Sequence, residues 1–201
     1  MQLPTEEQIR ALHHRYAPTQ SAFDEVYAHC CIVRDIATQL IDRHHLAVDA
    51  ELVRVGCMLH DIGVYSFFSD DGSFDSQKPY LQHGILGEAI LHAENFPEIL
   101  CRFASHHTGV GLSKEAIEQN DLPLPHQDFL AETPEEALVM YADKFNSKSG
   151  GQGIVFNSAD YYRKHARQFG EANVQAFDAL IQRFGEPDLD LLARQYNAKI
   201  R

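Results

Sequence analysis

A histidine and an aspartate stand side by side at the end of an apolar stretch, in the run Met58-Leu59-His60-Asp61-Ile62-Gly63. Upstream, Asp49 is a suitable N-cap, and apolar residues recur at helical spacing from there to Leu59. We expect this helix to stop at Gly63, because glycine adopts the left-handed conformation without steric cost. An imidazole and a carboxylate are costly to bury unless something pairs with them. The fold must therefore bring partners to this position.

The composition indicates one folded domain. The chain has 201 residues, of which 44% are hydrophobic and 10% aromatic, so a real core is expected and disorder is not. No stretch approaches the roughly 20 apolar residues that a membrane span needs. The first residues lack the basic and apolar regions of a signal peptide, so we expect a cytoplasmic protein without a membrane partner.

Charge and cysteine usage narrow the partners. The net charge of −12 argues against duplex nucleic acid, but a small phosphorylated substrate stays compatible because bound cations can reverse the local sign. The four cysteines form no CxxC pair and lie in apolar helical patterns. We interpret them as reduced, buried thiols, with disulfides or thiolate ligands as the alternative.

Apolar residues recur at helical spacing along most of the chain, and no segment alternates convincingly with a period of two. We therefore predict an all-α fold, with a surface loop at 66–79 that is either a lid or a plain connection. The glycine-rich segment 147–153 lacks the GxxxxGK[ST] pattern, so we predict a mobile loop there. The helices are expected at about 5–16, 21–45, 49–63, 83–95, 97–107, 113–119 and 134–145, with three more within 158–200.

Ionisable residues recur on or beside these apolar faces, often at helix ends. A single histidine in such a place is usually a satisfied core residue, but five helices with such groups would each need a separate partner. A shared metal centre satisfies them together. Mixed imidazole and carboxylate ligands suit Fe, Mn, Co, Ni or Zn and argue against calcium. The candidates are His29, His60, Asp61, His83, His106, His107 and Asp143.

The order of these residues, H…HD…H…HH…D, resembles the HD superfamily of metal-dependent phosphohydrolases, and His60-Asp61-Ile62-Gly63 resembles its HDIG subgroup. The resemblance covers about 21–150 and implies an HD-domain helical bundle there. The helices that the spacing predicts in the tail would form a C-terminal helical extension at about 158–201, all within one domain of residues 1–201. The resemblance implies one to three divalent transition-metal ions. The first would be held by His29, His60, Asp61 and Asp143. Asp61 would bridge to a second, held by His83 and by His106 or His107.

Three details bear on the subgroup. Glu25 stands one turn before His29, where some relatives, the HD-GYP phosphodiesterases, hold a third metal; a surface helix position is the alternative. Val64 replaces a lysine that many relatives carry, and no Gly-Tyr-Pro motif is present. The runs 106–109 and 141–143 also resemble bacterial diadenosine tetraphosphate hydrolases, but Val64 departs from their pattern too, so the substrate does not carry over.

The function that we expect is hydrolysis of a phosphoester or phosphoanhydride in a nucleotide-like substrate by metal-activated water. Catalytic candidates are Asp61, His106 or His107 as proton donor, and Lys148 for phosphate. Lys144 is a second phosphate candidate, and a solvated surface position is the alternative for both lysines. Two other functions stay open: a mixed-valent di-iron oxygenase on the same fold, and a non-catalytic metal- or nucleotide-binding regulatory module. Nothing in the tail looks chemical, so we assign it to packing or subunit contact and consider a homodimer.

Overall fold

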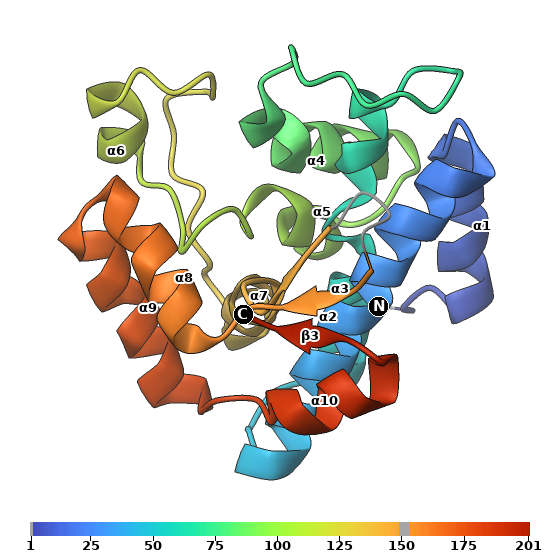
Figure 1. Ribbon diagram of the computed structural model, residues 1–201. Coiled ribbons are helices and arrows are strands. Elements are labelled where there is room, and N and C mark those ends of the chain that lie inside the picture. Colours follow the sequence, from blue (N-terminus) through green and yellow to red (C-terminus); the bar gives the residue numbers. More distant parts are fainter. Residues whose placement is uncertain (1, 149–152) are drawn as a thin grey trace.

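The computed structural model describes residues 2–148 and 153–201, and in this part of the chain the fold is helical, as predicted (Figure 1). The predicted loop at 147–153 falls mostly outside the described residues. Among the described residues no helix is both long and apolar enough to cross a membrane. The α-helices are α1 (Glu6–Tyr16), α2 (Gln20–His44), α3 (Ala50–Leu59), α4 (His83–Ala93), α5 (Glu98–Ser105), α6 (Lys114–Gln119), α7 (Pro134–Asp143), α8 (Ala159–Ala166), α9 (Glu171–Phe184) and α10 (Leu189–Tyr196).

Helix α2 runs through the middle of the core and packs against α3 and α7. Its stripe Val26, Val33, Ile36 and Leu40 is fully buried, as the helical spacing predicts. Helix starts follow the capping rules: Thr5 forms the predicted capping box with Gln8, and the Asp49 carboxylate accepts from the first backbone N–H groups of α3. All four cysteines are free thiols, and three of them are buried.

Gly63 plays a different part from the one predicted. Helix α3 ends at Leu59, and the chain continues into a 3₁₀ helix, η1 (Ile62–Phe67). Gly63 does not adopt a positive φ, so the prediction of a left-handed helix stop was wrong. A Cβ at Gly63 would lie 2.1 Å from the carbonyl oxygen of His83 and 2.3 Å from the backbone nitrogen of Gly87. The missing side chain therefore lets α4 pack directly against η1.

A small three-stranded sheet joins the end of the chain to the segment after α7. Strand β1 (Asn146–Ser147) pairs antiparallel with β2 (Val155–Phe156), and β2 pairs parallel with β3 (Lys199–Ile200). The sequence did not predict these strands, because two residues are too few to show an alternating pattern. In Figure 1, β3 lies at the C-terminal end, next to α10.

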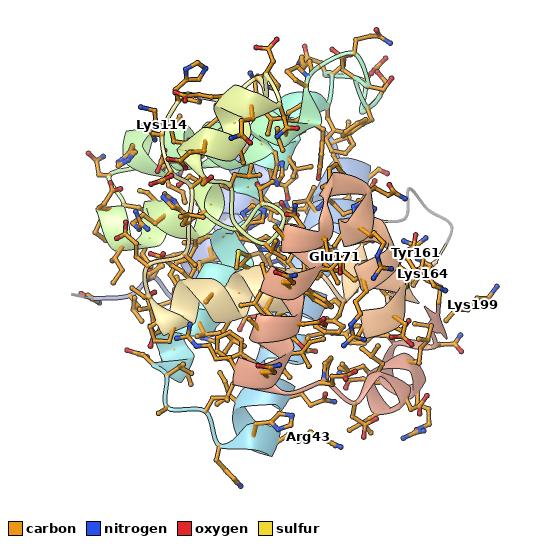
Figure 2. All side chains as sticks on the ribbon, turned by 90° about the vertical axis from the view of Figure 1, so that its left-hand side faces the viewer. Arg43, Lys114, Tyr161, Lys164, Glu171 and Lys199 are labelled. Atoms are coloured by element: carbon orange, nitrogen blue, oxygen red, sulfur yellow. The ribbon has the colours of Figure 1, made fainter. Side chains whose placement is uncertain are left out.

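The rest of the tail packs as predicted. Phe177 of α9 is fully buried, and its ring contacts those of Tyr141, Phe145 and Tyr162. In Figure 2, α9 lies on the face turned to the viewer, and its first residue, Glu171, is labelled. Two short 3₁₀ helices complete the fold: η2 (Tyr80–Gln82) leads into α4, and η3 (Arg167–Phe169) follows α8.

Candidate metal centre

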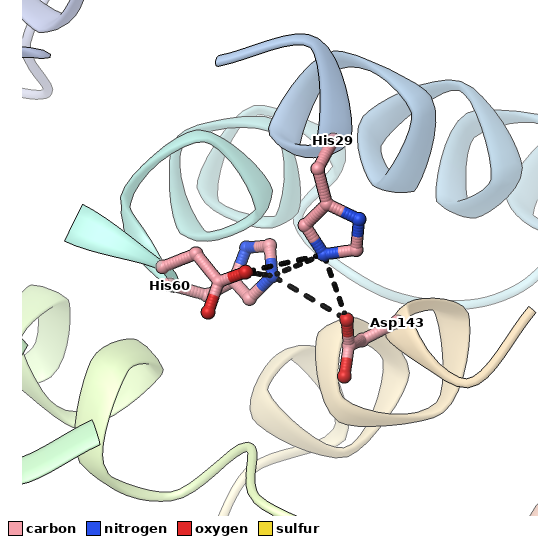
Figure 3. Close-up of side chains that lie close together, drawn as sticks. His29, His60 and Asp143 are labelled. Carbon is pink, nitrogen blue, oxygen red and sulfur yellow. Dashed lines mark hydrogen bonds and ion pairs between the residues drawn. The ribbon is translucent and has the colours of Figure 1, made fainter. Parts of the chain in front are cut away.

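Four of the predicted ligands meet in one buried group, which we call the first donor group: His29, His60, Asp61 and Asp143. His29 comes from α2, His60 and Asp61 follow α3, and Asp143 is the last residue of α7 (Figure 3). The Nε2 atom of His29 lies 2.9 Å from Asp143 Oδ1 and 3.2 Å from Asp61 Oδ2. The Nε2 atom of His60 lies 3.5 Å from Asp61 Oδ2 and 3.6 Å from Asp143 Oδ1.

The second donor group consists of Asp61, His83 and His107. Asp61 Oδ1 lies 3.6 Å from His83 Nε2 and 3.5 Å from His107 Nε2. The first group uses the other oxygen of the same carboxylate. Asp61, which is 1% exposed, therefore stands between two sets of donors and offers one oxygen to each.

Hydrogen bonds to Nδ1 set the direction of each imidazole. His60 donates to Cys57 O at 2.7 Å, His83 to Tyr80 O at 2.8 Å and His107 to Ala104 O at 2.7 Å. A carbonyl oxygen only accepts, so the proton of each neutral ring sits on Nδ1 and the lone pair on Nε2. The Nε2 atoms of His83 and His107 then face each other at 2.9 Å with no proton between them. A cation satisfies two such lone pairs, so the donor set fits a divalent transition metal.

His29 is held differently, by the side chain of Asn146. Its Nδ1 donates to Asn146 Oδ1 at 2.8 Å, and Asn146 Nδ2 in turn donates to Val155 O at 3.1 Å, which fixes the amide orientation. Burial and the Lys148 ammonium lower the pKa of His29, but the carboxylates around its Nε2 outweigh them and raise it. Asn146 thus leaves the Nε2 atom of His29 facing the carboxylates of Asp61 and Asp143.

The carboxylates stay ionised despite burial. Burial alone would raise the pKa of Asp61, but the Lys148 ammonium and the imidazoles hold it well below its usual value. Lys144 does the same for the pKa of Asp143. Burial lowers the pKa of His60, and burial together with the neighbouring His107 lowers that of His83 to about 3, so both rings are held in the neutral form.

The two candidate lysines have different positions. Lys148 forms an ion pair with Asp61 Oδ2, and its Nζ lies 5.9 Å from the centre of the Tyr80 ring. Lys144 is 6% exposed and donates to Asp143 Oδ2 at 2.7 Å and to His107 O at 3.0 Å. Lys144 is therefore not a solvated surface residue: it holds the Asp143 carboxylate and also lines the pocket described below.

The structure does not bring His106 and Glu25 into either donor group. The Nδ1 atom of His106 lies 2.6 Å from Ser105 Oγ, whose hydroxyl donates to Glu88. His106 does not line the pocket described below, whereas His107 does, so of the two alternatives that the sequence left open the structure places His107 beside the other candidates. Of two consecutive residues at a helix end only one can point inward, and here that is His107. Glu25 is half-buried on the pocket wall, near the first donor group but not part of it.

Both donor groups open into a pocket of about 770 Å³. One wall carries aromatic side chains from the segment after the His-Asp pair, including Phe68, Phe74 and Tyr80, together with Val64. Other lining residues come from the tail, which the sequence analysis assigned to packing or subunit contact. They include Tyr161, Tyr162, His165 and Arg201.

A comparison with known families identifies the class. The HD domain model matches residues 26–147, more than half of the sequence, and the chain belongs to the HD domain family. The crystal structure of the L. monocytogenes phosphodiesterase PgpH HD domain in complex with cyclic-di-AMP has the same fold, with a TM-score of 0.54 at 18% identity over 96% of this chain and 99% of that one.

Two relatives were found by sequence, and the match covers only part of each protein. An uncharacterized protein of Methanocaldococcus jannaschii is 37% identical over 123 residues, which are 60% of this chain and 65% of that protein. A tRNA (cytidine(56)-2'-O)-methyltransferase of Picrophilus torridus is 31% identical over 129 residues, 64% of this chain and 33% of that protein. The chain therefore spans only part of the length of either relative.

Proposed function

We propose that this protein is a metal-dependent phosphohydrolase that cleaves a phosphoester or phosphoanhydride bond in a nucleotide-like substrate. One observation carries the proposal: Asp61 offers its two oxygens to two adjacent donor groups at the buried end of an open pocket. Adjacent sites that share a carboxylate are the arrangement used to hydrolyse phosphate esters with two metal ions. Membership of the HD domain family supports the same reading.

We assign each side chain of the two donor groups a role in this reaction. His29, His60 and Asp143 would hold one cation, His83 and His107 the other, and Asp61 would join them. Bound divalent ions supply an activated water at neutral pH and neutralise charge on the phosphoryl oxygens. Lys148 contacts the shared carboxylate and lines the pocket, so its ammonium stands where a phosphoryl group would meet the centre.

A nucleotide-like substrate is supported by the fold neighbour, which was crystallised with cyclic-di-AMP, and by the pocket. Aromatic side chains such as Phe74 and Tyr80 line it and offer faces on which a base can stack. The name of the Picrophilus relative concerns a protein of which this chain spans a third, so we do not extend that activity to this chain.

The test combines metal analysis with a substrate panel. The protein is reconstituted with manganese, iron, cobalt, nickel or zinc, its metal content is measured, and hydrolysis of bis(p-nitrophenyl) phosphate and of mono- and dinucleotides is followed. Asp61→Asn should abolish turnover, because it removes the shared charge from both donor groups. Asp35→Asn, a carboxylate in an ion pair with Arg34 outside the pocket, is the matched control and should retain activity.

Full metal occupancy without hydrolysis of any phosphate ester would overturn the proposal. In that case a mixed-valent iron signal with oxygen uptake would favour the oxygenase, and tight nucleotide binding without turnover would favour a regulatory module.

A further inference from the structure

The end of the chain contributes a side chain to the pocket. Arg201 follows β3, and its backbone N–H donates to Phe156 O at 2.9 Å, while Ser158 N–H donates to Arg201 O at 2.7 Å. These bonds extend the pairing of β3 with β2. The Arg201 side chain lines the same pocket as the metal-binding candidates, although it lies far outside the region 26–147 that the family model matches.

The guanidinium of Arg201 is held in place on three sides. Its Nε donates to Asn157 Oδ1 at 2.8 Å and its Nη2 to Ser147 Oγ at 3.3 Å. Its Cζ lies 4.3 Å from the centre of the Tyr161 ring. Figure 2 labels Tyr161 on α8 and Lys199, the first residue of β3, on the same edge of the molecule. Stacking on a ring and donating from two nitrogens orients the planar group before any ligand arrives.

A buried amide connects this arginine to the metal centre. Asn157 is 4% exposed, and its Nδ2 donates to Lys144 O and to Ser147 Oγ, both at 3.0 Å. Lys144 directly follows Asp143, the ligand whose outer oxygen it clamps. The guanidinium is thus linked to the first donor group through two hydrogen bonds, by way of Asn157 and the backbone of Lys144.

Within the described residues, Arg201 forms no ion pair with a carboxylate. Its partners Asn157, Ser147 and Tyr161 are neutral, whereas arginines such as Arg102 and Arg163 form ion pairs with carboxylates. Two ammonium groups also line the pocket, and both already pair with a carboxylate: Lys144 with Asp143 and Lys148 with Asp61. In a protein of net charge −12, a positioned cation facing a pocket indicates an anionic ligand.

We propose that Arg201, supported by Tyr161 and Asn157, binds a second phosphoryl group of the substrate, away from the bond that is cleaved. This inference rests on the proposed function of the same site and narrows its substrate class to compounds with at least two phosphoryl groups, such as nucleoside di- or triphosphates. Substrates with a single phosphoryl group contact the metal centre but not Arg201.

The test measures binding, so it does not require turnover. Calorimetric titrations of the metal-loaded protein with adenosine, adenosine 5′-monophosphate and adenosine 5′-(β,γ-methylene)triphosphate are compared between wild type and Arg201→Ala. Loss of a charge-assisted contact should weaken binding of the triphosphate analogue roughly tenfold or more and leave the monophosphate unchanged. Arg201→Lys keeps the charge but loses the planar fork, so an intermediate affinity is expected.

Lys199→Ala is the matched control. It removes the same charge from an exposed residue on β3, two positions before Arg201 and outside the pocket, and should leave all three affinities unchanged. Thermal unfolding of each variant verifies that the fold is intact. The proposal is overturned if Arg201→Ala behaves like Lys199→Ala, or if it weakens all three ligands equally, which would indicate stacking of the base. If the protein hydrolyses no phosphate ester, the binding test of Arg201 can still succeed or fail. If Arg201→Ala leaves binding unchanged, the proposed hydrolysis is still tested by the substrate panel.

Discussion

Gly63→Ala should separate α4, whose first residue is the candidate ligand His83, from η1, which directly follows the His60-Asp61 pair. The added Cβ would meet the backbone of α4, at the carbonyl oxygen of His83 and the nitrogen of Gly87. These are backbone atoms, so no side-chain rotation relieves the contact. Helix α4 must move away from η1, and His83 moves with it.

The size of the movement follows from the distances. The Cβ would lie 2.1 Å from His83 O, and ordinary contact begins at 3.4 Å, so α4 must shift by about 1.3 Å. Metal–ligand distances tolerate deviations of roughly 0.2 Å. Such a shift would therefore remove His83 from the second donor group. Overpacking of this kind typically costs about 1–3 kcal/mol of unfolding free energy.

Two assays check this prediction. Thermal unfolding of Gly63→Ala should show a lower midpoint, by roughly 2–4 °C for each kcal/mol lost in a chain of this length. Metal analysis after reconstitution should show loss of one ion per chain relative to wild type. Gly87→Ala lies in the same interface, where the nearest atom to the new Cβ is Ala104 Cβ at 3.0 Å, so it should cost less and keep the metal content.

A Gly63→Ala protein as stable as wild type, with its full metal content, would refute the reasoning. So would equal effects of the two glycine substitutions, because the distances that they impose on α4 differ.

Three further predictions concern residues behind the site. Burial lowers the pKa of His13 from 6.5 to about 4. Between these two values the unfolded state binds a proton at His13 and the folded state does not. The contribution of His13 to the unfolding free energy should therefore fall by up to about 3 kcal/mol as the pH drops from 6.5 to 4, and a His13→Gln variant that lost stability as steeply as wild type would contradict this. Asn146→Ala removes the acceptor of His29 Nδ1 and should weaken metal binding roughly 10- to 100-fold in a chelator competition, whereas an unchanged affinity would count against it. Lys144→Met leaves Asp143 without its buried partner and should cost about 3 kcal/mol in denaturant unfolding; a loss near zero would show that the pair is dispensable.

The sequence predicted which residues gather in the two donor groups, because an ionisable residue on a face that must be buried needs a partner. His29 and Asp143 lie 114 positions apart, yet each stands on or beside an apolar face that must be buried. The spacing of apolar residues shows which face of a helix is buried. Because an ionisable residue on such a face needs a partner, the faces that carry them are expected to pack together. All six residues of the two donor groups were among the candidates.

Features that depend on contacts between residues far apart in the chain could not be predicted from the sequence. The choice between His106 and His107 depends on how the chain leaves α5, which spacing does not determine. Gly63 is needed because of the backbone of α4, some twenty residues further on. Arg201 reaches the pocket only because a two-residue strand pairs with another, and no pattern in the tail indicates that pairing.

The most direct test of the account is the metal stoichiometry of the wild-type protein and of Asp61→Asn, measured by elemental mass spectrometry after reconstitution and removal of free ions. Because one carboxylate serves both donor groups, the account predicts about two transition-metal ions per wild-type chain and a marked loss in the variant. A folded wild-type protein that retains no metal, or a variant that retains as much as wild type, would contradict it.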